Sequence, residues 1–111
     1  MSQAISFEDF IKTDIRVGTI IAVNDFPRAG NPAYQLTIDF GALGIKKTSA
    51  QITTLYNKDE LINRQVLAVV NFPKKQIANF MSECLVLGAV KGKAVILLHP
   101  ESNVPNGSVV S

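Results

Sequence analysis

The sequence of 111 residues contains one cysteine, one histidine and no tryptophan, and these scarcities exclude several kinds of site. A single cysteine, Cys84, cannot form an internal disulfide, which fits a reducing, cytoplasmic setting. The carboxylates are scattered singly, so no spacing typical of a metal site exists, and we expect no metal and no cofactor. Cys84 and His99 form the one conceivable nucleophile–base pair, but a cysteine at the start of an apolar strand usually acts as a small hydrophobe. We therefore expect a binding protein and not an enzyme.

Long apolar runs are also absent. No run approaches the ~18 residues that a membrane-spanning helix needs, so we expect no membrane insertion. Residues 1–12 hold two acids and lack the basic start of a secretory signal peptide. Hydrophobic residues make up 47% of the chain and charged residues 18%, which is typical of a globular protein. The length favours a single domain over residues 1–111, with a tail and a short helix in residues 1–12.

Acidic residues become scarce in the second half of the chain. Residues 1–40 carry three bases against five acids, whereas residues 61–100 carry five bases against one acid, a net charge of +4. This basic half indicates either an anionic partner or ordinary solvated loops that bear lysine.

The first residues predict a short amphipathic helix. Ser6 followed by Asp9 three residues later has the form of a capping box. Phe7, Phe10 and Ile11 then fall on one face of a helix of about two turns. A helix this short is not stable alone, so its apolar face must dock on another surface.

Short strands and turns follow the helix. The segments with strand patterns are residues 15–23, 34–40, 45–52, 65–72, 85–90, 94–98 and 109–110. Residues 53–60 predict a short helix or helical turn, and Gly18 inside the first strand indicates a bulge or a sharp bend. This spacing is typical of a sandwich or a small barrel. The length, the glycine and the insertion favour an all-β fold, a five-stranded Greek-key barrel of the OB type. It would carry a short N-terminal helix and a short helical insertion between strands three and four.

Three of the expected strands, residues 66–70, 85–90 and 94–98, are apolar on both faces. In a small barrel only the inward face fills the interior. The outward face needs a cover, and we expect a second copy of the chain to provide it. Phe7, Phe10 and Ile11 are the residues that we expect near the contact of this homodimer.

The basic residues suggest where a nucleic acid would lie. In an OB barrel, oligonucleotides lie on the face of strands two and three and on the flanking loops. Such sites combine cations for phosphate with polar or aromatic groups for bases. The candidates for these roles are Lys46, Lys47, Lys74 and Lys75 as cations, Ser49, Gln51 and Asn71 as polar groups, and Phe26, Phe72 and Phe80 as stacking or apolar contacts. The alternative for the three phenylalanines is a place in the core.

An ordered series of motifs then resembles a known family. The pieces are "DIRVGTIIAV" (14–23), "IDFG" (38–41), "GIKKTSAQIT" (44–53), "LINRQVLAVVNFP" (61–73), "MSECLVLG" (81–88) and "VPNGSVV" (104–110). Together they resemble the CsaA family, small bacterial and archaeal proteins built on the tRNA-binding domain that is also appended to methionyl-tRNA synthetases. The resemblance covers the chain from about Phe7 to Ser111.

The resemblance implies an OB-fold, a homodimer, binding of tRNA, and a proposed export-related chaperone role toward unfolded or precursor polypeptides. It also adds Ser82, in the "SE" piece, to the residues expected to bind nucleic acid. The chain departs from relatives after "NFP". Gln76, Ala78 and Met81 stand where relatives often carry Arg or Lys, and Asn79 stands where glycine is common.

Two functions therefore remain open, with a third behind them. The first is binding of tRNA or another structured RNA. The second is a chaperone whose dimer binds polypeptides in apolar pockets that include Phe26, Phe72, Phe80 and Met81. The third is a subunit that docks on a synthetase or a translocation factor.

Overall fold

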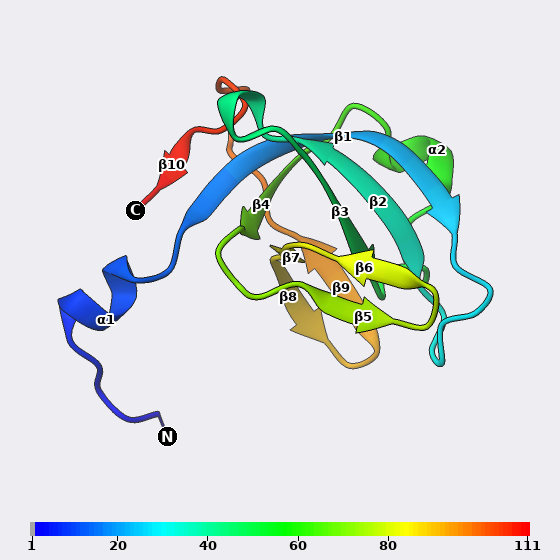
Figure 1. Ribbon diagram of the computed structural model, residues 1–111, viewed down its shortest axis with the longest axis horizontal. Coiled ribbons are helices and arrows are strands. Elements are labelled where there is room, and N and C mark those ends of the chain that lie inside the picture. Colours follow the sequence, from blue (N-terminus) through cyan, green and yellow to red (C-terminus); the bar gives the residue numbers. More distant parts are fainter. Residues whose placement is uncertain (1) are drawn as a thin grey trace.

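The computed structural model describes residues 2–111, and its strands form a nearly closed barrel (Figure 1). The main sheet has the strand order β3-β2-β1-β4-β7, and β10 pairs with β1 outside this path. Its strands are β1 (Ile15–Asp25), β2 (Tyr34–Asp39), β3 (Ile45–Ala50), β4 (Gln65–Val69), β7 (Leu85–Val86) and β10 (Val109–Val110). Two separate hairpins are β5 (Lys75–Ile77) with β6 (Phe80–Ser82), and β8 (Gly88–Lys91) with β9 (Ala94–Leu97). The helices are α1 (Phe7–Ile11), η1 (Gly41–Leu43) and α2 (Lys58–Leu61). The expected all-β barrel of the OB type is confirmed.

The long strand β1 connects both halves of the barrel. Its first half pairs with β4 and its second half with β2, and the register shifts between Ile20 and Ala22. The expected irregularity is therefore present, but it follows Gly18 and does not lie at it. Gly18 has a different role, because a Cβ there would lie 2.6 Å from Ile38 and 2.7 Å from Phe40. The glycine lets the strand pass directly over these two core side chains.

The inward faces of the strands form the core. Its largest fully buried apolar side chains are Ile20, Leu36, Ile38, Phe40, Leu61 and Val66. The alternation in residues 34–40 is confirmed, since Leu36, Ile38 and Phe40 point inward. Helix α2 lies between β3 and β4, as expected, and contributes Leu61 to the core. It begins later than the segment 53–60 predicted.

Side chains help to close the barrel between β3 and residues 82–84. Lys47 exchanges two hydrogen bonds with Glu83: its N–H donates to the Glu83 carboxylate at 2.9 Å, and its carbonyl accepts from the Glu83 N–H at 2.8 Å. Thr48 Oγ1 donates to the Cys84 carbonyl at 2.6 Å, and Ser82 Oγ accepts from the Ser49 N–H at 3.3 Å. The N–H and carbonyl of Lys47 and the N–H of Ser49 are therefore engaged, so this part of the β3 edge is not open for pairing with another strand.

Several strands differ in extent from the sequence prediction. Strand β4 ends at Val69, and the strand predicted over 85–90 divides around Leu87 into β7 and β8. The β5–β6 hairpin was not predicted. Its residues do not alternate in hydrophobicity. The residue at its tip, Ala78, has a φ of 51°, and a tight turn with positive φ is normally recognised in a sequence by a glycine, which is absent at this position.

Helix α1 stands apart from the barrel beyond the start of β1 (Figure 1). The Ser6 half of the predicted capping box is confirmed, because Ser6 Oγ accepts a hydrogen bond from the Asp9 N–H at 3.1 Å. None of the helix residues is buried, and the ring of Phe7 is 71% exposed. The apolar face that was expected to dock therefore finds no dock on its own barrel. Among residues 2–111, none of the helices has the length and hydrophobicity of a membrane-spanning segment.

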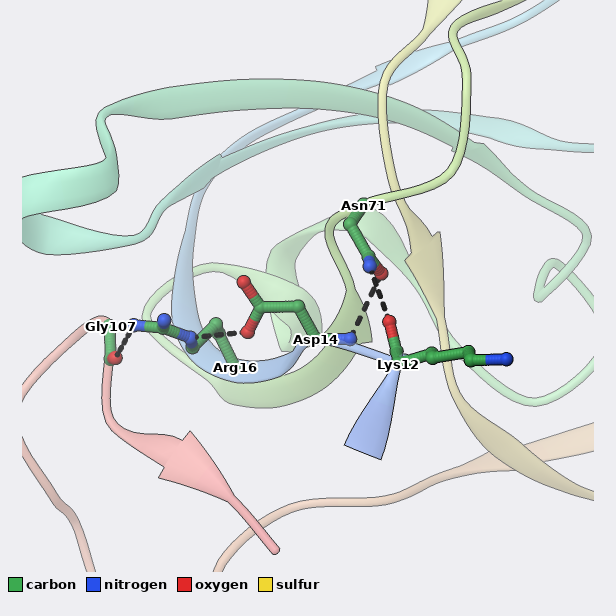
Figure 2. Close-up of polar contacts among 5 residues, drawn as sticks. All are labelled: Lys12, Asp14, Arg16, Asn71 and Gly107. Carbon is green, nitrogen blue, oxygen red and sulfur yellow. Dashed lines mark hydrogen bonds and ion pairs between the residues drawn. The ribbon is translucent and has the colours of Figure 1, made fainter. Parts of the chain in front are cut away.

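A polar network fixes the chain between α1 and the barrel (Figure 2). Asn71 Oδ1 accepts from the Asp14 N–H at 2.9 Å, and Asn71 Nδ2 donates to the Lys12 carbonyl at 2.7 Å. Arg16 donates to the Asp14 carboxylate at 2.6 Å and to the Gly107 carbonyl at 3.0 Å. Residues of the "DIR", "NFP" and "PNG" motifs thus meet in one place, and their role there is structural.

Candidate binding cleft

A cleft of about 460 Å³ lies on the barrel and is lined by several of the predicted site residues. It lies between the end of β3, the β5–β6 hairpin, β7 and β9. Its lining residues are Ser49, Ala50, Gln51, Ile52, Phe72, Pro73, Lys75, Ile77, Ser82, Cys84, Leu85, Val86, Val95 and Leu97. A volume of this size is within the range of small-ligand sites.

The cleft has an apolar floor and a polar rim. Ile52 and Leu97 are buried at the floor, whereas Phe72 and Leu85 are about half exposed. Lys75 is the one positively charged residue in the lining, and it has no ion-pair partner among residues 2–111. The cleft can therefore bind an apolar or aromatic group beside an anionic one.

The β5–β6 hairpin forms one wall of the cleft, and both of its ends are held. At one end, Lys74 Nζ lies 3.5 Å from the Glu83 carboxylate. At the tip, the Phe80 ring packs on Phe26 with centroids 5.3 Å apart and the planes inclined by 56°. These contacts position Lys75, which lies on this hairpin, at the cleft.

The structure brings together four of the seven predicted nucleic-acid residues. Ser49, Gln51, Lys75 and Ser82 all line the cleft, although they are separated by up to 33 positions in the sequence. The other three, Lys46, Lys47 and Lys74, lie outside the lining. Ser82 also stabilises the barrel, since its hydroxyl lies 3.1 Å from Thr48 Oγ1 and accepts a hydrogen bond from the Ser49 N–H.

Of the residues predicted to bind polypeptide, one lines the cleft and the others lie outside its lining. Phe72 lines the cleft. Phe26 is buried, with 4% exposure, and it supports Phe80 instead of facing the cleft. Met81 is 43% exposed and lies outside the lining.

Sequence reasoning missed most of the apolar lining. Leu85, Val86, Val95 and Leu97 form much of the cleft wall and were not proposed as binding residues. The signal for them was present, because they lie in segments that are apolar on both faces. That pattern was assigned to a dimer contact, and it is also what an apolar cleft requires.

Cys84 and His99 do not form a catalytic pair. Neither hydrogen-bonds the other: the Cys84 carbonyl accepts from Thr48, and His99 Nδ1 lies 2.9 Å from the Pro100 carbonyl. Burial of the Cys84 thiol raises its pKa from 9.0 to about 11, so at neutral pH it is an unreactive thiol. Within the part of the chain that the structure describes, no group of three His, Cys, Asp or Glu residues could hold a metal ion.

These features define the class of protein as a small β-barrel binding domain of the OB type. The family model "Putative tRNA binding domain" matches residues 15–109. The chain belongs to this family of tRNA-binding domains, and within it the chain is CsaA-like, as the motif series predicted.

Solved structures support this membership along the whole chain. The crystal structure of chaperone CsaA from Bacillus anthracis str. Ames has 49% sequence identity and a TM-score of 0.94, with 98% of this chain and 100% of that chain covered. The CsaA chaperone protein from Picrophilus torridus has 55% identity and a TM-score of 0.91, with 97% and 100% covered.

A curated relative shows the same domain inside a longer protein. The methionine–tRNA ligase of Pyrococcus furiosus is 36% identical over 108 residues, which are 97% of this chain. The chain spans only 15% of the length of that ligase. The similarity therefore concerns one domain of the ligase and not its enzymatic activity.

Proposed function

We propose that this chain binds tRNA, or another structured RNA, through the cleft and its basic rim, and that it catalyses no reaction. The observation that carries the proposal is the convergence of Lys75, Ser49, Gln51 and Ser82 on one recess with an aromatic side chain, Phe72. Cations position a phosphate backbone, hydroxyl and amide groups hydrogen-bond bases, and an exposed ring offers a stacking surface. Membership in a family of tRNA-binding domains supports the same ligand.

Lys47 extends this basic surface outside the cleft. It is exposed on β3, two residues before Ser49 at the rim. Lys74 is exposed as well, but the Glu83 carboxylate 3.5 Å away partly neutralises it. In the proposed complex Lys75 is therefore the principal phosphate contact of the hairpin, and Lys74 is a secondary one.

A second candidate function is binding of extended polypeptide segments as a chaperone. It is favoured by the apolar floor and wall of the cleft, which include Ile77, Leu85, Val86 and Leu97, and by the high similarity to two solved chaperone structures. A volume of about 460 Å³ accommodates large apolar side chains of a client. A role in protein export would follow from this candidate.

The proposed assembly is a homodimer in the cytoplasm. The exposed apolar face of α1, which carries Phe7, Phe10 and Ile11, finds no dock on its own barrel and supports this assembly. A partner barrel is the surface that we propose it covers.

One experiment separates RNA from polypeptide as the ligand. Fluorescently labelled tRNA and a labelled extended apolar peptide are titrated separately onto the wild type, Lys75→Ala and Phe72→Ser. Binding of RNA predicts that Lys75→Ala weakens tRNA binding strongly and peptide binding little. Lys93→Ala is the matched control, because it removes the same charge from an exposed turn outside the cleft.

The second candidate predicts the opposite pattern. In that case the wild type binds the peptide, Phe72→Ser weakens the complex, and tRNA binds no more tightly than it does to an unrelated basic protein. If the wild type binds neither the tRNA nor the peptide, both candidates are contradicted.

A further inference from the structure

A second recess lies away from the binding cleft and is lined by residues for which the proposed function gives no role. Its volume is about 210 Å³. The lining residues are Asn63, Arg64, Gln65, Leu97, His99, Pro100 and Asn103. None of them is acidic, so the one permanent charge in this recess is the positive charge of Arg64. We call these residues the Arg64 recess.

The guanidinium of Arg64 is held in place while it remains exposed. Its Nε donates to the Glu60 carbonyl at 2.9 Å, and its Cζ lies 5.3 Å from the centroid of the Tyr56 ring. Its two terminal nitrogens donate to no acceptor within residues 2–111, and no carboxylate there forms an ion pair with it. Because the Arg64 side chain is already ordered, it loses less conformational entropy when an oxyanion binds.

The neighbouring side-chain amides are suited to the same ligand. The His99 Nδ1 atom lies 2.9 Å from the Pro100 carbonyl, which can only accept, so Nδ1 carries the hydrogen and Nε2 of this tautomer is an acceptor, which can bond only a protonated phosphate oxygen. The side-chain amides of Asn63 and Asn103 make no hydrogen bond within residues 2–111, so their N–H groups are available as donors.

The recess is also fixed in shape. Gln65 exchanges two hydrogen bonds with Val104, at 2.7 and 3.1 Å, and its amide donates as well to Asn106 at 3.2 Å. These bonds hold the loop that carries Asn103 against the start of β4. On the other side, Asn63 has a φ of 70°, and its N–H donates to the Ile20 carbonyl at 2.8 Å.

From this arrangement we propose that the Arg64 recess binds a phosphate group. Guanidinium pairs with phosphate oxygens in a bidentate manner, and the amide N–H groups of Asn63 and Asn103 complete the oxyanion's hydrogen bonds. The recess has several times the ~30 Å³ that a water occupies, which leaves room for a phosphate with part of its sugar. The phosphate belongs either to a bound RNA or to a free nucleotide. If RNA is the source of the phosphate, the inference rests on the proposed function. If a free nucleotide is the source, it does not.

NMR measures binding at the recess directly, through the chemical shifts of its own residues. Isotope-labelled protein is titrated with inorganic phosphate at constant ionic strength, then with adenosine monophosphate, then with tRNA. We expect saturable shifts of the Asn63 and Asn103 side-chain amides and of the His99 ring with phosphate. Arg64→Gln should weaken phosphate binding about tenfold or more, as expected for the loss of a charge-assisted hydrogen bond.

Two further variants keep the result interpretable. Arg28→Gln, which removes the same charge from an exposed loop, should leave phosphate binding unchanged. Asn103→Asp adds a negative charge without touching the Tyr56 and Glu60 contacts of Arg64, and it should abolish phosphate binding even if Arg64→Gln folds poorly.

The outcomes distinguish this inference from the proposed function. Shifts at the recess with phosphate, lost in Asn103→Asp, support the recess whether or not tRNA binds. Shifts with tRNA that are also lost in Asn103→Asp identify RNA as the source. Absence of saturable shifts with phosphate overturns the inference, even if tRNA binds through the cleft and the proposed function holds. Equal phosphate affinities of the wild type and Asn103→Asp overturn it too.

Discussion

The side chain of Asn71 is hydrogen-bonded to the backbone N–H of Asp14, 57 positions earlier, at 2.9 Å. Its amide also donates to the Lys12 carbonyl at 2.7 Å (Figure 2). The preceding residue, Val70, donates its N–H to the Asp14 carbonyl at 2.9 Å. After β4 ends at Val69, a side chain therefore continues the pairing between the two segments. This contact fixes where the chain leaves the barrel toward α1.

We predict that Asn71→Ala loosens this link. The variant loses two hydrogen bonds at an exposed position, so the free energy of unfolding should fall by roughly 1–2 kcal/mol. Amide hydrogen exchange is the sharper measurement, because protection of the Asp14 N–H should fall while that of the core strands stays. Asn79→Ala, at the exposed hairpin tip, is the control. Unchanged exchange at Asp14 would show that the side chain contributes nothing to this link.

The packing around Gly18 gives a second prediction. Gly18→Ala should destabilise the barrel by about 1–3 kcal/mol, because the added methyl group would overlap Ile38 and Phe40. Gly30→Ala is a matched control, since a Cβ at Gly30 meets nothing within 4 Å. Urea unfolding measures both variants. Equal stability of the two would mean that the strand moves away from the core without cost.

The Cys84 thiol provides a prediction of pH dependence. Burial raises its pKa from 9.0 to about 11, so in the range between these values the unfolded chain releases a proton that the folded chain keeps. The stability contributed by this thiol is therefore complete below pH 9.0 and is lost as the pH rises toward 11. Cys84→Ala should show a smaller loss of stability over this range.

The same pKa controls the reactivity of Cys84. Because only the thiolate attacks, alkylation by iodoacetamide at pH 8 should be about a hundredfold or more slower in the folded protein than in denaturant. Rates within tenfold of each other would contradict the buried, protonated thiol.

A homodimer should depend on the apolar face of α1. Sedimentation equilibrium at micromolar concentration should give a species of twice the 12.0 kDa chain mass. Phe7→Ser combined with Ile11→Ser should shift it toward the monomer, because a stable contact buries roughly 1,200–2,000 Å² and these side chains are large and exposed. Lys12→Ser, on the same helix end, should leave the mass unchanged. A wild type that sediments only as the monomer would contradict the proposed assembly.

The fold was predictable from the sequence to the extent that it depends on local pattern. Alternation in residues 34–40 and the Ser6 cap identified β2 and the start of α1, because both signals act over a few residues. The β5–β6 hairpin escaped notice, since its tip is held by the packing of Phe80 on Phe26, a residue 54 positions earlier in the sequence. Long-range contacts of this kind leave no periodic trace.

The cleft was predictable only in part for a similar reason. Its polar rim follows from motifs, so Ser49, Gln51, Lys75 and Ser82 were among the candidates. The apolar wall comes from segments whose two-sided hydrophobicity fits either a cleft or a dimer contact, and the sequence does not separate these uses. The burial of Phe26 depends on where the hairpin tip folds, which the sequence did not indicate.

The dependence of tRNA affinity on salt tests the central claim most directly. Labelled tRNA is titrated onto the wild type, Lys75→Ala, Lys74→Ala and the control Lys93→Ala at a series of salt concentrations. The account predicts that Lys75→Ala weakens binding and reduces the magnitude of the slope of log affinity against log salt by about 0.7–0.9, the value of one phosphate contact. Lys74→Ala should reduce it less, because Glu83 lies 3.5 Å from its ammonium group. If Lys75→Ala keeps both the affinity and the slope of the wild type, RNA does not bind at this cleft.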